Sequence, residues 1–306
     1  MGVPVIKRWY GLHRVVVLLG ISVFLAGYSG MAQPVPAAVI GDPAPDLKHP
    51  AQLVELTVPS HGARVNAVFY LSAGAGVHPT VLLLHGFPGN EQNLDLAQSM
   101  RRAGWHVLTL HYRGSWGSPG DFSFTHALED TEAALEFVRD PANAAKYGID
   151  TKTIVLIGHS MGGFMALHAA ADHADISGVV VLSAANFGKM ATGAKTPEGE
   201  KKVIEFYRQE LAPLAGCTAE SLWAETKANA GKWDFVDYAP ALKATPVLIL
   251  EADDGLGGAN AAMAAALRKV GNEKVKELHM ATDHSFSDHR IALQAAVVSW
   301  LGGVGK

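Results

Sequence analysis

The stretch GHSMGG, residues 158–163, separates two segments with different patterns of apolar residues. Before it lies the apolar run Thr153–Ile157, typical of a buried strand, and after it the alanine-rich run Phe164–Ala170, typical of a helix. A chain that passes from strand to helix over so few residues must turn sharply, and glycines leave room where side chains would collide. We therefore expect Ser160 at the corner of a strand–turn–helix unit, with its hydroxyl held out at the carboxyl end of a sheet.

Strands and helices alternate along most of the chain. The expected strands are residues 53–58, 64–71, 80–84, 105–110, 153–157, 179–182, 247–250 and 275–278. The expected helices between and after them are residues 93–103, 125–139, 161–171, 259–270 and 287–301. The turn Ser60-His61-Gly62 joins the first two strands into an antiparallel hairpin. The later strands are apolar on both faces, so the pattern predicts an α/β fold: a mostly parallel eight-stranded sheet with helices on both faces.

One interval, residues 186–245, is too long to be a simple crossover connection. It contains two further helical candidates, residues 200–211 and 219–228. We interpret the interval as a helical cap inserted into a single domain that spans residues 51–306. Five aromatic residues of this cap are expected to pack on the core rather than contact a ligand: Phe206, Tyr207, Trp223, Trp233 and Phe235.

The first 32 residues have the layout of a secretory signal peptide. Three cations, Lys7, Arg8 and Arg14, precede the apolar block Val15–Ala26, and small residues follow it. That block is shorter than the roughly 20 residues needed to span a bilayer, so cleavage before Gln33 is expected, with no stable membrane span afterwards. The protein is then exported, to the periplasm or the medium. Residues 33–50 contain five prolines and are expected to form an extended linker.

Composition narrows the class of protein and its partners. With 49% hydrophobic and 18% charged residues, the chain is typical of a soluble globular protein. Its formal charge is −4, and loss of the signal peptide makes it more acidic, which argues against a nucleic-acid partner. Cys217 is the only cysteine, so no intrachain disulfide is possible. No histidine pair has metal-binding spacing and no dinucleotide or phosphate loop follows the first strand, so no cofactor is expected.

A serine hydroxyl is a poor nucleophile and needs a nearby base, together with donors for the oxyanion that it creates. The GHSMGG motif in its strand–turn–helix setting resembles the nucleophile turn of the α/β-hydrolase family, over about residues 53–301. The resemblance implies that Ser160 is the nucleophile and that the N–H groups of Met161 and Phe87 hold the oxyanion. Phe87 lies in His85-Gly86-Phe87-Pro88-Gly89, where His85 is expected to brace the loop rather than to act as a base.

The base and the acid should follow the nucleophile along the chain, the acid first. Of three late histidines, His279 falls in the last strand and His289 in the last helix, so His284, in the loop between them, is the expected base.

The acid should come from Glu251-Ala252-Asp253-Asp254, after another strand. The family's usual spacing to an aliphatic residue, here Leu256, favours Asp253 over Asp254, with Glu251 the outside choice. The glycine common before this acid is Ala252 here, which leaves the register of the loop open.

The loop Tyr112–Gly120 resembles that of hydrolases related to prolyl oligopeptidases, although a rigid loop with Arg113 in a buried ion pair is at least as good an interpretation. The leading hypothesis is an esterase-like serine hydrolase that cleaves a small-molecule carboxylic ester through an acyl-enzyme intermediate. Three alternatives stay open: a small peptidase or amidase, a cofactor-free lyase or haloperoxidase-like enzyme on the same triad, and a binding protein that keeps the fold without activity.

Overall fold

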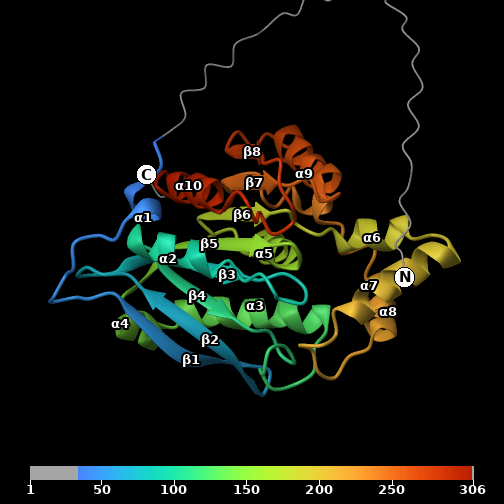
Figure 1. Ribbon diagram of the computed structural model, residues 1–306, viewed down its shortest axis with the longest axis horizontal. Coiled ribbons are helices and arrows are strands. Elements are labelled where there is room, and N and C mark those ends of the chain that lie inside the picture. The colour runs from blue at the N-terminus through green and yellow to red at the C-terminus, as the bar shows by residue number, and fades with distance from the viewer. Residues whose placement is uncertain (1–33, 305–306) are drawn as a thin grey trace, which may run out of the picture. The chain divides into compact units, whose positions relative to one another are not determined.

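The computed structural model describes residues 34–304 (Figure 1). The predicted signal peptide, residues 1–32, lies outside the described residues. Within residues 34–304, no helix has both the length and the apolar character needed to cross a membrane.

Eight strands form one sheet, as the sequence predicts. They are β1 (Gln52–Ser60), β2 (Ala63–Leu71), β3 (His78–Leu84), β4 (His106–Leu110), β5 (Ile149–His159), β6 (Gly178–Leu182), β7 (Val247–Glu251) and β8 (Val275–His279). Their order in the sheet is β1-β2-β4-β3-β5-β6-β7-β8. The hairpin β1–β2 is antiparallel, β2 pairs antiparallel with β4, and every later pairing is parallel. The expected hairpin and the mostly parallel sheet are confirmed.

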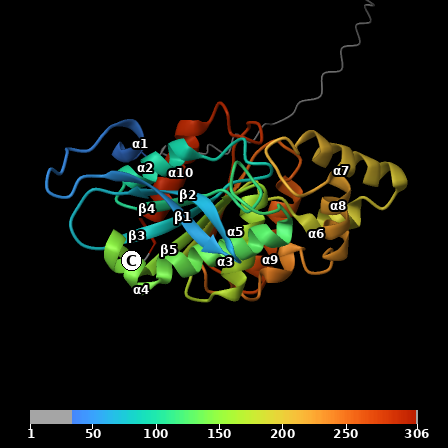
Figure 2. The same ribbon diagram turned by 90° about the horizontal axis from the view of Figure 1, so that it is seen from below.

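Helices cover both faces of this sheet. Figure 2 shows the sheet lying between them. On one face lie α2 (Leu94–Arg102) and α10 (Arg290–Leu301), and on the other lie α3 (Phe124–Arg139), α5 (Met161–Asp172) and α9 (Gly257–Lys269). The short α4 (Pro141–Tyr147) follows α3. Successive residues of a strand point to opposite faces, so Leu82 and Leu84 of β3 pack in the core beneath α3 and α5, whereas Leu83 packs in the other core. This double burial explains why the strands read as continuous apolar runs.

The interval interpreted above as a cap, residues 186–245, lies between β6 and β7. It consists of α6 (Phe187–Gly193), α7 (Pro197–Gln209), α8 (Ala219–Ala228) and the 3-10 turn Phe235–Tyr238 (Figure 1). Four of its aromatic side chains, Tyr207, Trp223, Trp233 and Phe235, are buried, which supports packing as their role. Phe206 differs from them, because 47% of it is exposed.

The segment before Ala51 departs from the expected extended linker. Residues Ala37–Ile40 form a short helix, α1, which lies against α2 and α10. The Arg102 side chain donates a 2.6 Å hydrogen bond from Nε to the carbonyl of Ala38, and Val39 packs on the core beneath α2 and α10. The folded unit therefore begins before Ala51, because a few small apolar residues of the lead-in complete the surface of that core.

Candidate active site

Ser160 stands at the corner between β5 and α5 in a backbone conformation that side chains rarely adopt. Its φ is 54° and its ψ is −116°. The neighbouring glycines are required by space: a Cβ on Gly158 would lie 1.9 Å from the carbonyl oxygen of Gly162. A Cβ on Gly162 would in turn lie 2.1 Å from the carbonyl oxygen of Leu84. The close approach of strand, turn and helix thus holds Ser160 half-buried at the carboxyl end of the sheet, as the sequence predicts.

The loop after β3 lies directly against this serine. A Cβ on Gly86 would be 2.9 Å from Cβ of Ser160, so only glycine lets the loop come so near. Among the backbone hydrogen bonds of residues 34–304, neither the N–H of Phe87 nor that of Met161 has an acceptor. Met161 is the first residue of α5, where such N–H groups are free because the helix offers them no partner. Two free donors beside Ser160 suit the stabilisation of an oxyanion.

His85 braces the loop after β3, in agreement with its expected role. Its Nδ1 donates a 2.7 Å hydrogen bond to the carbonyl of Gly86, and the Tyr112 hydroxyl donates to the carbonyl of His85 at 3.2 Å. Burial lowers the pKa of His85 to about 4, so the ring is neutral at pH 7. A neutral, buried ring that is already bonded to its own loop is unsuited to proton exchange with a substrate.

His284 lies in the loop between β8 and α10, and its ring is 39% exposed. Its Nδ1 donates a 2.6 Å hydrogen bond to Oδ2 of Asp254. In residues 34–304 this is the one hydrogen bond of the ring, so Nε2 is free to exchange a proton. The other two late histidines lie elsewhere: His279 pairs with Asp253, and His289 precedes α10 and pairs with Asp288.

The carboxylate bonded to His284 is that of Asp254, not that of Asp253, which corrects the choice made from sequence. Asp253, favoured on the family's spacing, is 63% exposed and accepts a 2.8 Å hydrogen bond from Nε2 of His279. The side chain of Asp254 is 5% exposed and faces His284. The two adjacent carboxylates are bonded to different histidines, so only Asp254 faces the base. Glu251 is not bonded to His284 either, and burial raises the pKa of its carboxyl.

Asp254 is held in place by the segment that follows the neighbouring strand β6. Its Oδ1 accepts from the N–H of Leu256 at 2.9 Å, and the Ser183 hydroxyl accepts from the N–H of Ala252, two residues before Asp254, at 3.2 Å. Burial alone would raise the pKa of Asp254, but the bonds from His284 and Leu256 outweigh it and hold the pKa below its usual value. The carboxylate is therefore ionised at neutral pH and can accept the Nδ1 proton of His284.

No hydrogen bond joins the Ser160 hydroxyl to His284 in residues 34–304 of this structure. The two residues are connected instead through His159, next to Ser160 in the chain. Nε2 of His159 lies 2.8 Å from the carbonyl oxygen of His284, and the two rings are 4.6 Å apart between centroids. Catalytic hydrogen bonds are often long in unliganded enzymes and tighten with substrate. The sequence analysis assigned no role to His159. The one sign of a role in the sequence was its position directly before the nucleophile.

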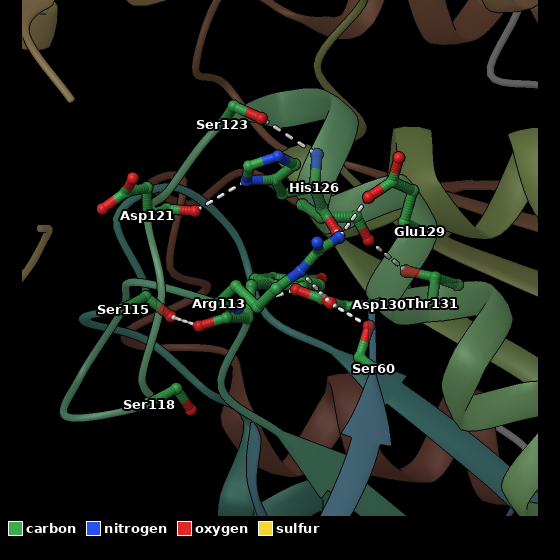
Figure 3. A network of polar contacts seen from close by, with 12 residues as sticks. Ser60, Arg113, Ser115, Ser118, Asp121, Ser123, His126, Glu129, Asp130 and Thr131 are labelled. Carbon is green, nitrogen blue, oxygen red and sulfur yellow. Dashed lines mark hydrogen bonds and ion pairs between the residues drawn. The ribbon is translucent and has the colours of Figure 1, made fainter. Parts of the chain in front are cut away.

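Arg113 lies in a buried ion pair, the interpretation given above for the Tyr112–Gly120 loop (Figure 3). Its Nε donates to Oδ1 of Asp130 at 2.7 Å, and its backbone N–H donates to Oδ2 of the same carboxylate at 2.7 Å. Its guanidinium also pairs with Glu129. Ser60, at the end of β1, donates to Asp130 at 2.5 Å. The network joins β1, the loop after β4 and α3, so it is structural.

The same loop also meets the cap. The backbone N–H of Trp116 donates to the carbonyl of Pro213 at 2.9 Å, and that of Phe122 to the carbonyl of Ala215 at 2.8 Å.

Across residues 34–304, no cluster of three histidine, cysteine or acidic side chains could hold a metal ion.

Comparison with known proteins agrees with this fold. Est1E of Butyrivibrio proteoclasticus, solved with ferulic acid bound, superposes with a TM-score of 0.64 at 19% identity, over 80% of this chain and 97% of that one. An esterase of Pyrobaculum calidifontis superposes with a TM-score of 0.59 at 19% identity, over 83% and 86% of the two chains.

Sequence relatives match shorter segments. The sn-1-specific diacylglycerol lipase ABHD11 of Xenopus tropicalis is 32% identical over 114 residues, which are 36% of this chain and 33% of the lipase. The chain spans about a third or less of the length of the curated relatives that it matches. Residues 81–297 match the model of the alpha/beta hydrolase family, which covers more than half of the chain. With its eight-stranded sheet and its serine turn after β5, this chain belongs to the alpha/beta hydrolase family.

Proposed function

We propose that the protein is a serine hydrolase that cleaves small carboxylic esters through an acyl-enzyme intermediate. The observation that carries the proposal is the meeting of the strained Ser160 turn with the His284–Asp254 pair at the carboxyl ends of parallel strands. One of the two solved structures named above is that of a protein called an esterase, and a matching relative is called a lipase, which favours an ester over an amide.

In the proposed reaction Oγ of Ser160 attacks the ester carbonyl carbon, and Nε2 of His284 takes the hydroxyl proton. The carbonyl oxygen becomes an oxyanion, to which the N–H groups of Phe87 and Met161 donate. The intermediate then expels the alcohol, which receives the proton from His284, and leaves an acyl group on Ser160. Water, deprotonated by His284, then attacks this acyl group. The bond between the acyl carbon and Oγ breaks, the carboxylic acid leaves, and His284 returns its proton to Ser160. Asp254 fixes the tautomer of His284 and stabilises its cationic form.

The test is the Ser160→Ala variant, assayed on p-nitrophenyl esters of graded chain length beside aminoacyl amides. We expect a loss of turnover of several orders of magnitude, since what remains without a triad member is only about 10³ to 10⁴ over the reaction in water. Ser299→Ala, at an exposed site on α10, is the matched control and should behave as wild type. Unchanged ester turnover in Ser160→Ala would rule out the mechanism, and faster turnover of the amides would favour a peptidase.

We also propose that the protein is exported, on the pattern of residues 1–32. Amino-terminal sequencing of the protein purified from the periplasm or medium should then begin near Gln33. Recovery only from the cytoplasm, with Met1 or Gly2 at the amino terminus, would contradict export.

A further inference from the structure

His159 lies directly before the nucleophile, yet it takes no part in the reaction proposed above. It is buried, and one of its ring nitrogens, Nδ1, has no hydrogen-bond partner within residues 34–304. The other, Nε2, has a well-placed one, the carbonyl oxygen of His284 at 2.8 Å. A carbonyl oxygen only accepts, so Nε2 must carry the ring proton and donate it. That bond joins two residues 125 positions apart in the chain.

The loop that carries His284 is anchored on each side of that residue. On one side the N–H of Asp253 donates to the carbonyl of Thr282 at 2.9 Å. On the other side the guanidinium of Arg290 donates to the carbonyl of Ser285 at 2.9 Å. The carbonyl of His284 lies between these anchors, and its hydrogen bond comes from the serine turn itself.

The surroundings of His159 make it a fixed part of that turn. It is preceded by Gly158, where a Cβ would meet Gly162 at 1.9 Å, and it is followed by the strained Ser160. Its Nδ1 edge faces the loop after β3, where a Cβ on Gly86 would lie 3.5 Å from that nitrogen. The ring of His284 packs on the ring of His159, with centroids 4.6 Å apart and planes inclined by 39°. His159 therefore touches the segments of the nucleophile, the oxyanion donor and the base.

His159 is not itself the base. Its Nε2 proton is committed to the carbonyl of His284, and its Nδ1 is buried without a hydrogen-bond partner in residues 34–304. Burial, together with the nearby imidazole of His284, lowers the pKa of His159 to about 3. The ring is therefore neutral at pH 7, with its proton on Nε2.

We infer that His159 is a positioning residue, whose Nε2–H holds the backbone of His284 so that the imidazole of His284 is aimed at Ser160. The inference rests on the proposed function and adds to it a residue that acts through the base. Reaction rates depend steeply on such placement, and a shift of about 1 Å can cost about 100-fold in rate. Loss of the donor should therefore lower kcat, and it should leave KM nearly unchanged because His159 does not contact the substrate.

Two amide substitutions give a matched test. His159→Gln places an amide N–H as many bonds from Cβ as Nε2 of histidine and can restore the bond to the carbonyl of His284. His159→Asn places its N–H at the position of Nδ1 and cannot. We expect kcat on a p-nitrophenyl ester to stay near wild type in His159→Gln and to fall about 10- to 100-fold in His159→Asn. KM should change little in either variant, and the rate of Ser160 labelling by a fluorophosphonate should fall in parallel with kcat.

Both amides are polar and smaller than histidine, so a purely structural role would affect them alike. Equal kcat values in the two variants, whether near wild type or both reduced, would overturn the inference. The unfolding midpoint of each variant is measured beside its kinetics, and a difference in kcat between equally stable variants supports it. Ser160→Ala, assayed in parallel, tests the proposed function separately: full activity there defeats the mechanism whatever the His159 variants do.

Discussion

Nδ1 of His284 donates a 2.6 Å hydrogen bond to Asp254, while the adjacent Asp253 is bonded to His279. The two aspartates follow the same strand, β7, and differ by one position in the chain. The structure gives them opposite environments: the side chain of Asp254 is 5% exposed and that of Asp253 is 63% exposed. The two aspartates can therefore be compared directly to test which carboxylate supports the base.

Asp254→Asn should reduce kcat on a p-nitrophenyl ester by about 10⁴-fold, because an amide no longer fixes the tautomer of His284 or stabilises its cation. Asp253→Asn is the matched control, because it makes the same chemical change one residue away, in the exposed pair with His279. Its kcat should stay close to that of wild type. A larger loss in Asp253→Asn than in Asp254→Asn would restore the choice made from the family's spacing.

Arg113→Met should destabilise the fold strongly. Asp130 is fully buried, and removal of the guanidinium leaves its carboxylate without its charged partner. Breaking one side of a buried pair costs about 3–5 kcal/mol, read from the urea unfolding midpoint. Arg208→Met is the control, since that side chain is 50% exposed and pairs with Glu205 and Glu220 at the surface. Its cost should be much smaller than that of Arg113→Met, and equal costs in the two variants would show that the Asp130 site tolerates an unpaired charge.

The free energy of unfolding should fall as the pH drops from 6.5 toward 4.5. Burial lowers the pKa values of His85 and His106 to about 4 and that of His159 to about 3, against 6.5 in an unfolded chain. In this window the unfolded chain binds protons at these sites and the folded chain does not, so stability is full above pH 6.5 and is lost as the pH falls. Each such proton contributes a slope of about 1.4 kcal/mol per pH unit.

Urea unfolding at a series of pH values measures that slope. His159→Gln removes one of these titrating rings, so its stability should depend less steeply on pH over the same window. The same slope in wild type and His159→Gln would mean that His159 is already protonated in the folded protein.

Phe206 is the exposed member of the cap aromatics, and it lies beside the residue whose N–H is a proposed oxyanion donor. Its ring centroid is 6.3 Å from that of Phe87. Phe206→Ala should raise KM for phenyl acetate by about 2- to 10-fold and leave KM for ethyl acetate almost unchanged, because an aromatic pair contributes about 0.5–1.5 kcal/mol. Ile291→Ala, an exposed apolar site on α10, is the control. An equal rise in KM for both esters would show that Phe206 gives no preference for an aromatic ester.

The strands, the main helices and the serine turn could be predicted from the sequence because their causes are local. Strand β3, for example, alternates between the two faces of a sheet covered on both sides, so it reads as a continuous apolar run. Gly158 and Gly162 are required by contacts within four residues of Ser160 and with β3. The loop position of His284 likewise followed from its place between a strand and a helix.

Only the tertiary structure decided which carboxylate faces His284. Asp253 and Asp254 are adjacent residues of the same type, and nothing in their immediate sequence says which of them faces the base. That choice is made by long-range bonds that the acid loop donates, from the N–H of Ala252 to the Ser183 hydroxyl and from the N–H of Asp253 to the carbonyl of Thr282. The bond of His159 to His284 and the packing of α1 on α10 also join segments far apart in sequence. Periodicity and glycine positions specify local shape, whereas the pairing of distant side chains depends on how the finished layers meet.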